Sequence, residues 1–138
     1  MTNTLLLAIT ILLQYIAQVE SEDNKYAIRT EPNGIQSAGM YQITDLYLKD
    51  VNQFAGTSFT KADRFDPDKA ELITKLYLIH YGQKRKVQEM GLDQAIETLA
   101  RIHNGGPSGH LKTATDPYWD KIKKKMLNNR VRITKCLI

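Results

Sequence analysis

The chain has 138 residues, of which 42% are hydrophobic and 25% are charged, and its formal net charge is +4 with a pI near 9.1. This composition is that of a globular protein and excludes a disordered chain, while the length suffices for about one domain with its own core. The single cysteine, Cys136, excludes an intramolecular disulfide. That argues against a disulfide-stapled secreted fold and is compatible with folding in a reducing cytosol.

The first expected element is a helix that starts at residues 2–4 and runs to about Glu22, with Asn24 as a left-handed residue after its end. The apolar run at residues 5–13 lacks the basic segment and the cleavage site of a signal peptide. It is also shorter than the about 20 residues that a membrane span needs. We therefore interpret this run as a buried helix rather than as a signal or a span.

Glu20 lies on the apolar face of this helix, because steps of three and four residues lead back to Ile16, Leu13 and Ile9. Burial and the negative end of the helix dipole would both raise the pKa of its carboxyl group. A carboxylic acid that keeps its proton near neutral pH is what general acid catalysis at a glycosidic oxygen requires. The position also suits an ordinary solvated residue after a helix, and periodicity alone leaves both interpretations open.

Turn residues and helix caps divide the rest of the chain into a loop and four more helices. The expected elements are a loop or small hairpin at 25–39, a helix at Asp45–Phe54 capped by Thr44, an irregular link at 57–64, a helix from Pro67 to about Tyr81 capped by Asp66 and ended by Gly82, a basic connector at 83–88, a helix at Leu92–His103, and a helix from Pro117 to about Asn128 capped by Asp116. The tail at 130–138 is predicted to be a strand or an extended segment. Apolar residues on most sides of the 67–81 helix make it a candidate central helix, and we expect one mainly α domain spanning 1–138.

The sequence does not indicate a metal or nucleotide site. His80, His103 and His110 lack helix-spaced ligand partners, and no thiols accompany them. Gly105 and Gly106 follow neither the Walker nor the dinucleotide-binding pattern. We therefore expect no metal and no cofactor.

Basic residues gather near the C-terminus. The cluster consists of Lys121, Lys123, Lys124, Lys125, Arg130, Arg132 and Lys135. It is either a solvated helix face with a tail, or a surface that attracts phosphates or the teichoic and carboxylate groups of a cell wall. The positive net charge favours a polyanionic partner and does not choose among nucleic acid, an anionic membrane and a wall.

Four segments in a fixed order distinguish this chain from an anonymous helical domain. They are YIAQVESEDNKYAI at 15–28, GMYQIT at 39–44, LARIHNGGPSG at 99–109 and PYW at 117–119. Together they resemble the lysozyme-like superfamily, most closely the soluble lytic transglycosylases and goose-type lysozymes. Those proteins have an E-S pair after an apolar helix, then G-L-M-Q-[IV], then A-Y-N-[AG]-G and a late tyrosine. The resemblance implies a lysozyme-like helical fold with a central buried helix and a small loop or hairpin next to the cleft.

The resemblance also implies site residues, position by position. It makes Glu20 the catalytic acid. The substrate-binding positions that it implies are Ser21, Gly39, Tyr41, Gln42, His103, Asn104 and Tyr118. The chain departs from the family pattern at Tyr41, which stands inside the G-M-Y-Q segment, and at His103, which replaces the usual tyrosine.

The implied activity is cleavage of the β-1,4 bond between N-acetylmuramic acid and N-acetylglucosamine in peptidoglycan, by a lytic transglycosylase or a muramidase. No second carboxylate belongs to a matched motif, although Asp23, Asp45 and Asp50 are candidates. The family precedent implies that Glu20 acts alone, first as acid and then as base. The N-acetyl group or the 6-hydroxyl of the substrate then completes the reaction, and water or the 6-hydroxyl is the acceptor.

We expect a monomer whose partner is the peptidoglycan glycan strand, with no nucleic-acid partner and no membrane span. A cytoplasmic location until release to the wall, as in a phage-type endolysin, is compatible with the sequence. Two other functions remain possible interpretations of the sequence. One is a non-catalytic lysozyme-like domain that binds the wall or a partner. The other is a small basic nucleic-acid-binding protein, an interpretation supported only by residues 121–138.

Overall fold

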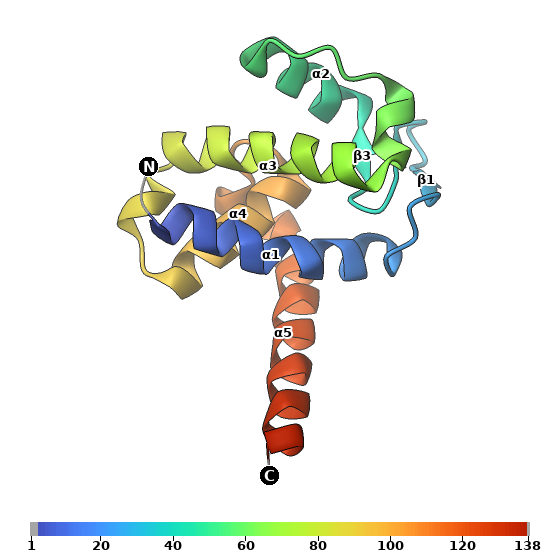
Figure 1. The fold of residues 1–138 in the computed structure, drawn as a ribbon. Helices are drawn as coiled ribbons and strands as arrows, with labels where there is room; N and C mark the ends of the chain where they lie inside the picture. Colours follow the sequence, from blue (N-terminus) through green and yellow to red (C-terminus); the bar gives the residue numbers. More distant parts are fainter. Residues whose placement is uncertain (1–2, 138) are drawn as a thin grey trace.

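The computed structural model describes the backbone of residues 3–137 and the side chains of residues 4–130, and it is mainly helical (Figure 1). The helices are α1 (Asn3–Ser21), α2 (Asp45–Ala55), α3 (Pro67–Lys84), α4 (Leu92–Gly105) and α5 (Asp116–Leu137). The strands are β1 (Ile28–Thr30), β2 (Gln36–Ala38) and β3 (Ile43–Thr44), and they form one antiparallel sheet in the order β1-β2-β3. The expected fold class is confirmed, and residues 25–39 form the hairpin rather than a loop.

Helix α1 is a core helix. Leu5, Leu12 and Ile16 are completely buried against α3, α4 and α5. By length and composition alone the stretch Thr4–Ser21 could cross a membrane, with a mean hydropathy of 1.5, a property that core helices of soluble proteins share. Packing accounts for part of this hydropathy, because 44% of the stretch is buried, whereas Leu6 and Leu7 are 42% and 49% exposed.

The end of α1 differs from the expectation at Asn24. The left-handed residues are Glu22 and Asp23, with φ of 53° and 62°. The chain reverses there because the Asp23 amide donates to the carbonyl oxygen of Ala17 (3.1 Å). The Asn24 side chain instead accepts a hydrogen bond from the Tyr26 amide (3.0 Å), which fixes the following turn.

The caps of α2 and α3 lie where the sequence predicts them. The Thr44 hydroxyl accepts a hydrogen bond from the Tyr47 amide, and the Asp66 carboxylate accepts from two amides of the first turn of α3. Gly82 was expected to end α3 but lies inside it. A Cβ atom at Gly82 would lie 2.7 Å from Leu5 Cδ1, so the glycine permits close packing of α1 on α3. Leu72 is 46% exposed, and α3 is therefore buried on fewer sides than its sequence indicates.

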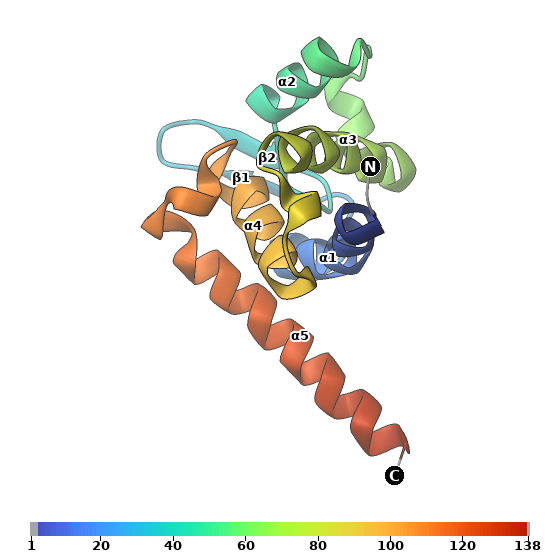
Figure 2. The same ribbon diagram turned by 90° about the vertical axis from the view of Figure 1, so that its left-hand side faces the viewer.

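Helix α5 projects from the body of the molecule (Figures 1 and 2). It starts at Asp116, which already has helical φ and ψ angles of −57° and −47° and is therefore not an N-cap residue. The helix continues to Leu137, so the expectation of a strand or extended segment at 130–138 is wrong as far as residue 137. No glycine or proline follows Pro117, so the sequence contains no residue that would stop the helix.

Candidate active site

A cleft of about 620 Å³ opens between the hairpin, α2, α3 and the end of α4. Its lining residues are Glu20, Arg29, Glu31, Ser37, Gln42, Thr44, Leu46, Tyr47, Lys49, Asp50, Gln53, Tyr77, His103, Asn104, Gly106 and Pro107. Four of the eight residues implied by the sequence motifs are among them. The cleft therefore brings together segments of the first and fourth helices with the hairpin.

Glu20 lies in the last turn of α1, and it is partly buried where it lines the cleft. Burial raises the pKa of its carboxyl group to about 7, and the positive charges of Arg29 and Lys121 oppose this rise. Arg29 also donates a hydrogen bond to the backbone carbonyl oxygen of Glu20 (3.3 Å). The raised pKa keeps a proton on the Glu20 carboxyl group up to near-neutral pH, where an ordinary glutamate is ionised.

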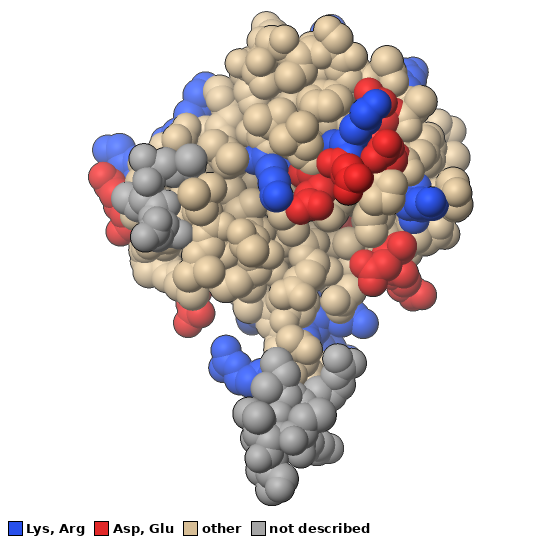
Figure 3. Space-filling model, viewed as in Figure 1, with Lys and Arg blue, Asp and Glu red and all other residues tan. Residues whose placement is uncertain are grey.

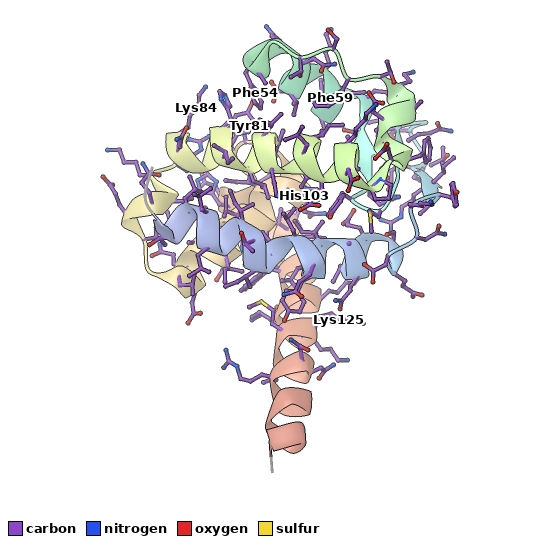
Figure 4. The ribbon with its side chains drawn as sticks, viewed as in Figure 1. Phe54, Phe59, Tyr81, Lys84, His103 and Lys125 are labelled. Carbon is purple, nitrogen blue, oxygen red and sulfur yellow. The ribbon has the colours of Figure 1, made fainter. Side chains whose placement is uncertain are left out.

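His103 connects the two sides of the cleft floor, and Figure 4 labels it in the middle of the body. Its Nε2 lies 3.0 Å from the carbonyl oxygen of Tyr41, and its Nδ1 lies 3.0 Å from the hydroxyl of Tyr47. A carbonyl oxygen only accepts, so the proton belongs on Nε2 and the Tyr47 hydroxyl donates to Nδ1. Burial lowers the pKa of His103 to about 4, so the ring is neutral at neutral pH and holds the loop rather than supplying charge.

The loop between β2 and β3 is held by Gln42. Its side-chain amide donates to the carbonyl oxygens of Gly39 (2.8 Å) and Ala27 (3.2 Å), and its Oε1 accepts from the Ser37 hydroxyl (2.8 Å). Gln42 has a φ of 52° and Gly39 a φ of 81°. A Cβ atom at Gly39 would lie 1.9 Å from the carbonyl oxygen of Arg64, so only glycine fits this position without a shift of the backbone.

Ser21, Gly39, Tyr41 and Tyr118 do not line the cleft in the part of the chain that the structure describes. The Ser21 hydroxyl lies 2.8 Å from the carbonyl oxygen of Met40 and joins α1 to the loop at Gly39–Gln42. Tyr41 is buried and offers its carbonyl oxygen to His103. These positions support the cleft from behind, and their expected contact with substrate stays a prediction.

Tyr118, at the start of α5, is buried beside His103, with 6.4 Å between the ring centroids. Among the described residues its buried hydroxyl has no hydrogen-bond partner. Burial and then the negative charge of Glu20 raise the pKa of this hydroxyl well above its ordinary value. The phenol is therefore neutral, and the charge of the Glu20 carboxylate acts on it.

No protein-family model matches the sequence. The invertebrate-type lysozyme 6 of Caenorhabditis elegans is 37% identical to it over 115 residues, which cover 80% of this chain and 82% of that protein. The chain belongs to the invertebrate-type lysozyme family. A lysozyme of Magallana gigas is 36% identical over 92 residues, covering 67% of this chain and 62% of that protein.

Solved lysozyme structures share the fold of this family member. The Meretrix lusoria lysozyme, crystallised in complex with Aeromonas hydrophila PliI, has a TM-score of 0.66 and 27% identity, with 82% of this chain and 86% of that chain covered. The Tapes japonica lysozyme, at 24% identity and a TM-score of 0.65 over 89% of each chain, agrees in fold. The expected lysozyme-like superfamily is confirmed. The relatives named here are invertebrate-type lysozymes, not lytic transglycosylases or goose-type lysozymes, and membership of their family makes the chain a muramidase-type enzyme.

Two carboxylates accompany Glu20 in the cleft of this lysozyme-family chain. Glu31 in the turn of the hairpin and Asp50 on α2 both line it, and Asp50 accepts a hydrogen bond from the Tyr81 hydroxyl. Of the other candidates, Asp45 is paired with Lys61 (3.2 Å) and does not line the cleft, nor does Asp23. Sequence reasoning missed Glu31 because it lies outside every matched motif.

The cleft also contains side chains that no motif indicated. The rings of Tyr47 and Tyr77 stack with centroids 3.7 Å apart and give it an aromatic wall, while Arg29 adds a cation close to Glu20. The sequence indicated the place of Arg29 only through the predicted loop or hairpin at residues 25–39, because a hairpin folds this segment back toward the end of α1. Among the described residues no group of three or more histidines, cysteines or carboxylates could hold a metal ion.

Proposed function

We propose that this chain cleaves the β-1,4 bond between N-acetylmuramic acid and N-acetylglucosamine in peptidoglycan, with Glu20 as general acid and then as general base. The observation that carries the proposal is a carboxyl group with a pKa of about 7 in the wall of the cleft of a lysozyme-family fold. A group with this pKa is present in both protonation states at neutral pH, which suits a residue that must first give and then take a proton.

In the first step the Glu20 carboxyl group gives its proton to the glycosidic oxygen as the bond to the anomeric carbon breaks. The resulting carboxylate is stabilised by Arg29 and Lys121, whose charges favour the ionised form. In the second step the carboxylate takes a proton from the acceptor that attacks the anomeric carbon. Water as acceptor gives a reducing sugar, and the 6-hydroxyl of the substrate gives a 1,6-anhydro sugar.

A second carboxylate would either stabilise positive charge at the anomeric carbon or activate water. Glu31 suits this role better than Asp50, because the Asp50 carboxylate already accepts a hydrogen bond from Tyr81. If Glu31→Gln and Asp50→Asn both leave the rate unchanged, the N-acetyl group of the substrate supplies the assistance instead. A large loss of rate in Glu31→Gln would assign the role to Glu31.

The other motif residues have roles in binding and support in this proposal. Gln42, His103 and Asn104 line the cleft. In this proposal they contact the glycan strand. We expect the Tyr118 hydroxyl to donate to the Glu20 carboxylate once it forms, because the charge of Glu20 acts on this hydroxyl and the hydroxyl has no hydrogen-bond partner among the described residues. We also expect residues 1–138 to act as one domain and as a monomer.

The test is digestion of purified sacculi followed by mass spectrometry of the soluble muropeptides. Reducing products would establish hydrolysis, and 1,6-anhydro products would establish transglycosylation. Glu20→Gln should abolish both, whereas Asp23→Asn, which removes a neighbouring charge outside the cleft, should not change the yield. A different outcome would be that the folded native chain binds sacculi without releasing products, and that Glu20→Gln binds them equally well. The chain would then be a non-catalytic wall-binding domain.

A further inference from the structure

A second groove lies where α5 leaves the body of the molecule, beside the last turns of α1. It consists of two hollows, of about 280 and 340 Å³, that share Gln18, Lys125 and Asn128 as lining residues. None of the residues that line these hollows lines the catalytic cleft. We call it the α1–α5 groove.

The α1–α5 groove is strongly basic. Lys121, Lys124 and Lys125 line it, and Glu22 is the one acidic residue of its lining. Among the described side chains these three lysines form no ion pair, whereas Lys123 on the same helix pairs with Asp120. Figure 3 shows Lys and Arg atoms where α5 meets the body, and Figure 4 labels Lys125 there. The groove therefore presents three ammonium groups and a single carboxylate, that of Glu22, to a ligand.

The spacing of these groups suits a chain of anions rather than a single one. Lys121 and Lys125 are one helical turn apart, about 6 Å along the axis of α5. Side-chain amides of Gln18, Asn128 and Asn129 lie in the same lining and can bond to hydroxyl groups between the anions. Lysine ammonium groups bind phosphates as point charges and require no fixed bidentate geometry.

The residues that line the groove also favour one class of polyanion over another. The lining contains no aromatic side chain, and Val19 is its apolar member. Proteins that bind single-stranded nucleic acid stack its bases on aromatic rings, each stack being worth about 1–3 kcal/mol. The groove offers charge and hydrogen bonds but no surface for bases, which favours a phosphodiester polymer whose repeating unit is a small polyol.

We propose that the α1–α5 groove binds a linear poly(polyol phosphate), the anionic polymer class that many bacterial cell walls carry beside their glycan strands. The choice of a wall polymer rests on the proposed function, whereas the binding itself requires no cleavage. The groove would hold the chain on the wall through the polymer while the catalytic cleft, with its own separate lining, takes the glycan strand.

The experiment measures binding of the full chain to soluble poly(glycerol phosphate) at several salt concentrations, which involves no glycosidic bond. The test variant is Lys124→Gln/Lys125→Gln, and the matched control is Lys86→Gln/Lys123→Gln, which removes the same charge at exposed lysines outside the groove. Lys121 is left intact because its charge reaches Glu20. We expect the test variant to bind about tenfold more weakly and to lower the salt slope by about two, while the control stays within about twofold of the native chain.

Equal weakening of both double variants would overturn the proposal, because it would show attraction by net charge alone. Single-stranded RNA that binds as tightly as poly(glycerol phosphate), and loses as much affinity in the test variant, would overturn the choice of a polyol polymer. The two proposals fail separately. If the chain binds the polymer but releases no muropeptides, only the proposed activity is refuted. If it digests sacculi but does not bind the polymer, only the proposed polymer site is refuted.

Discussion

Glu20 and His103 line one cleft, and burial shifts their pKa values in opposite directions. Burial disfavours the charged form of each group, which raises the pKa of the carboxyl group to about 7 and lowers that of the imidazole to about 4. Both side chains therefore favour the neutral form between these values. For the acid this is the reactive state, and for the imidazole it is the state that can accept a hydrogen bond from Tyr47.

The raised pKa of Glu20 predicts the alkaline limb of the activity profile. Above about pH 7 the acid loses its proton, so kcat/KM for sacculus cleavage should fall by about tenfold per pH unit. Asp23→Asn should show the same profile. A rate that stays level well above pH 7 would show that Glu20 is not the proton donor.

The two shifts also predict opposing effects of pH on stability. The folded state binds more protons than the unfolded state at Glu20 between its ordinary value of 4.5 and about 7, so this group lowers the stability as pH rises through that window. At His103 the folded state binds fewer protons between about 4 and 6.5, so this group raises the stability as pH rises. Each pKa shift of about 2.5 corresponds to about 3 kcal/mol, and the two contributions should nearly cancel between about pH 4.5 and 6.5.

Substitutions should separate these two effects in urea unfolding at several pH values. Glu20→Gln removes the contribution of Glu20 and leaves that of His103, so its free energy of unfolding should increase from about pH 4 to 6.5; His80 and His110, whose pKa values burial also lowers, act in the same direction. His103→Phe removes the contribution of His103 and leaves that of Glu20, and although its stability is lower throughout, it should decrease further as pH rises to about 7. Parallel profiles for both variants would contradict the assignment.

At the scale of elements, the loop between β2 and β3 depends on the close approach of Gly39 to Arg64. Gly39→Ala adds a Cβ atom 1.9 Å from a backbone oxygen at a φ of 81° and should cost about 3 kcal/mol or more. Gly34→Ala is the matched control, because its φ is 86° and its Cβ would meet nothing within 4 Å. It should cost only about 1 kcal/mol, and denaturant unfolding measures the difference. Equal losses would show that the loop can move away.

Elements with a complete local signal were predictable from the sequence. The apolar stripe behind Glu20 fixes the burial of α1, and the caps Thr44 and Asp66 fix the starts of α2 and α3, because each depends on residues within one or two helical turns. Features that depend on distant segments were not predictable. Gly82 looked like a helix end because its contact with Leu5 lies on another helix.

The candidate site divides in the same way. Motif spacing identified Glu20, Gln42, His103 and Asn104, all of which line the cleft. It could not identify Glu31, since the hairpin brings this residue to the cleft through strand pairing rather than through a sequence pattern. The bonds of His103 to Tyr41 and Tyr47 likewise join residues more than fifty positions apart.

At the scale of the whole molecule, the fold is held by one apolar core without a disulfide. Five of its helices contribute buried side chains, and Cys136 has no second cysteine with which to pair. The thermal midpoint of unfolding should therefore be the same with and without a reducing agent. A lower midpoint under reduction would show a disulfide between two chains, which non-reducing electrophoresis would reveal as a dimer.

The projection of α5 from the body, visible in both ribbon views, gives the molecule a long axis. A helix of 22 residues is about 33 Å long, which equals the diameter of a small domain. Rotation about this axis meets less friction than end-over-end rotation, so the molecule should tumble anisotropically in solution. The backbone N–H bonds of α5 lie nearly parallel to this axis. Their ¹⁵N spin relaxation should report a longer rotational correlation time than that of N–H bonds perpendicular to the axis.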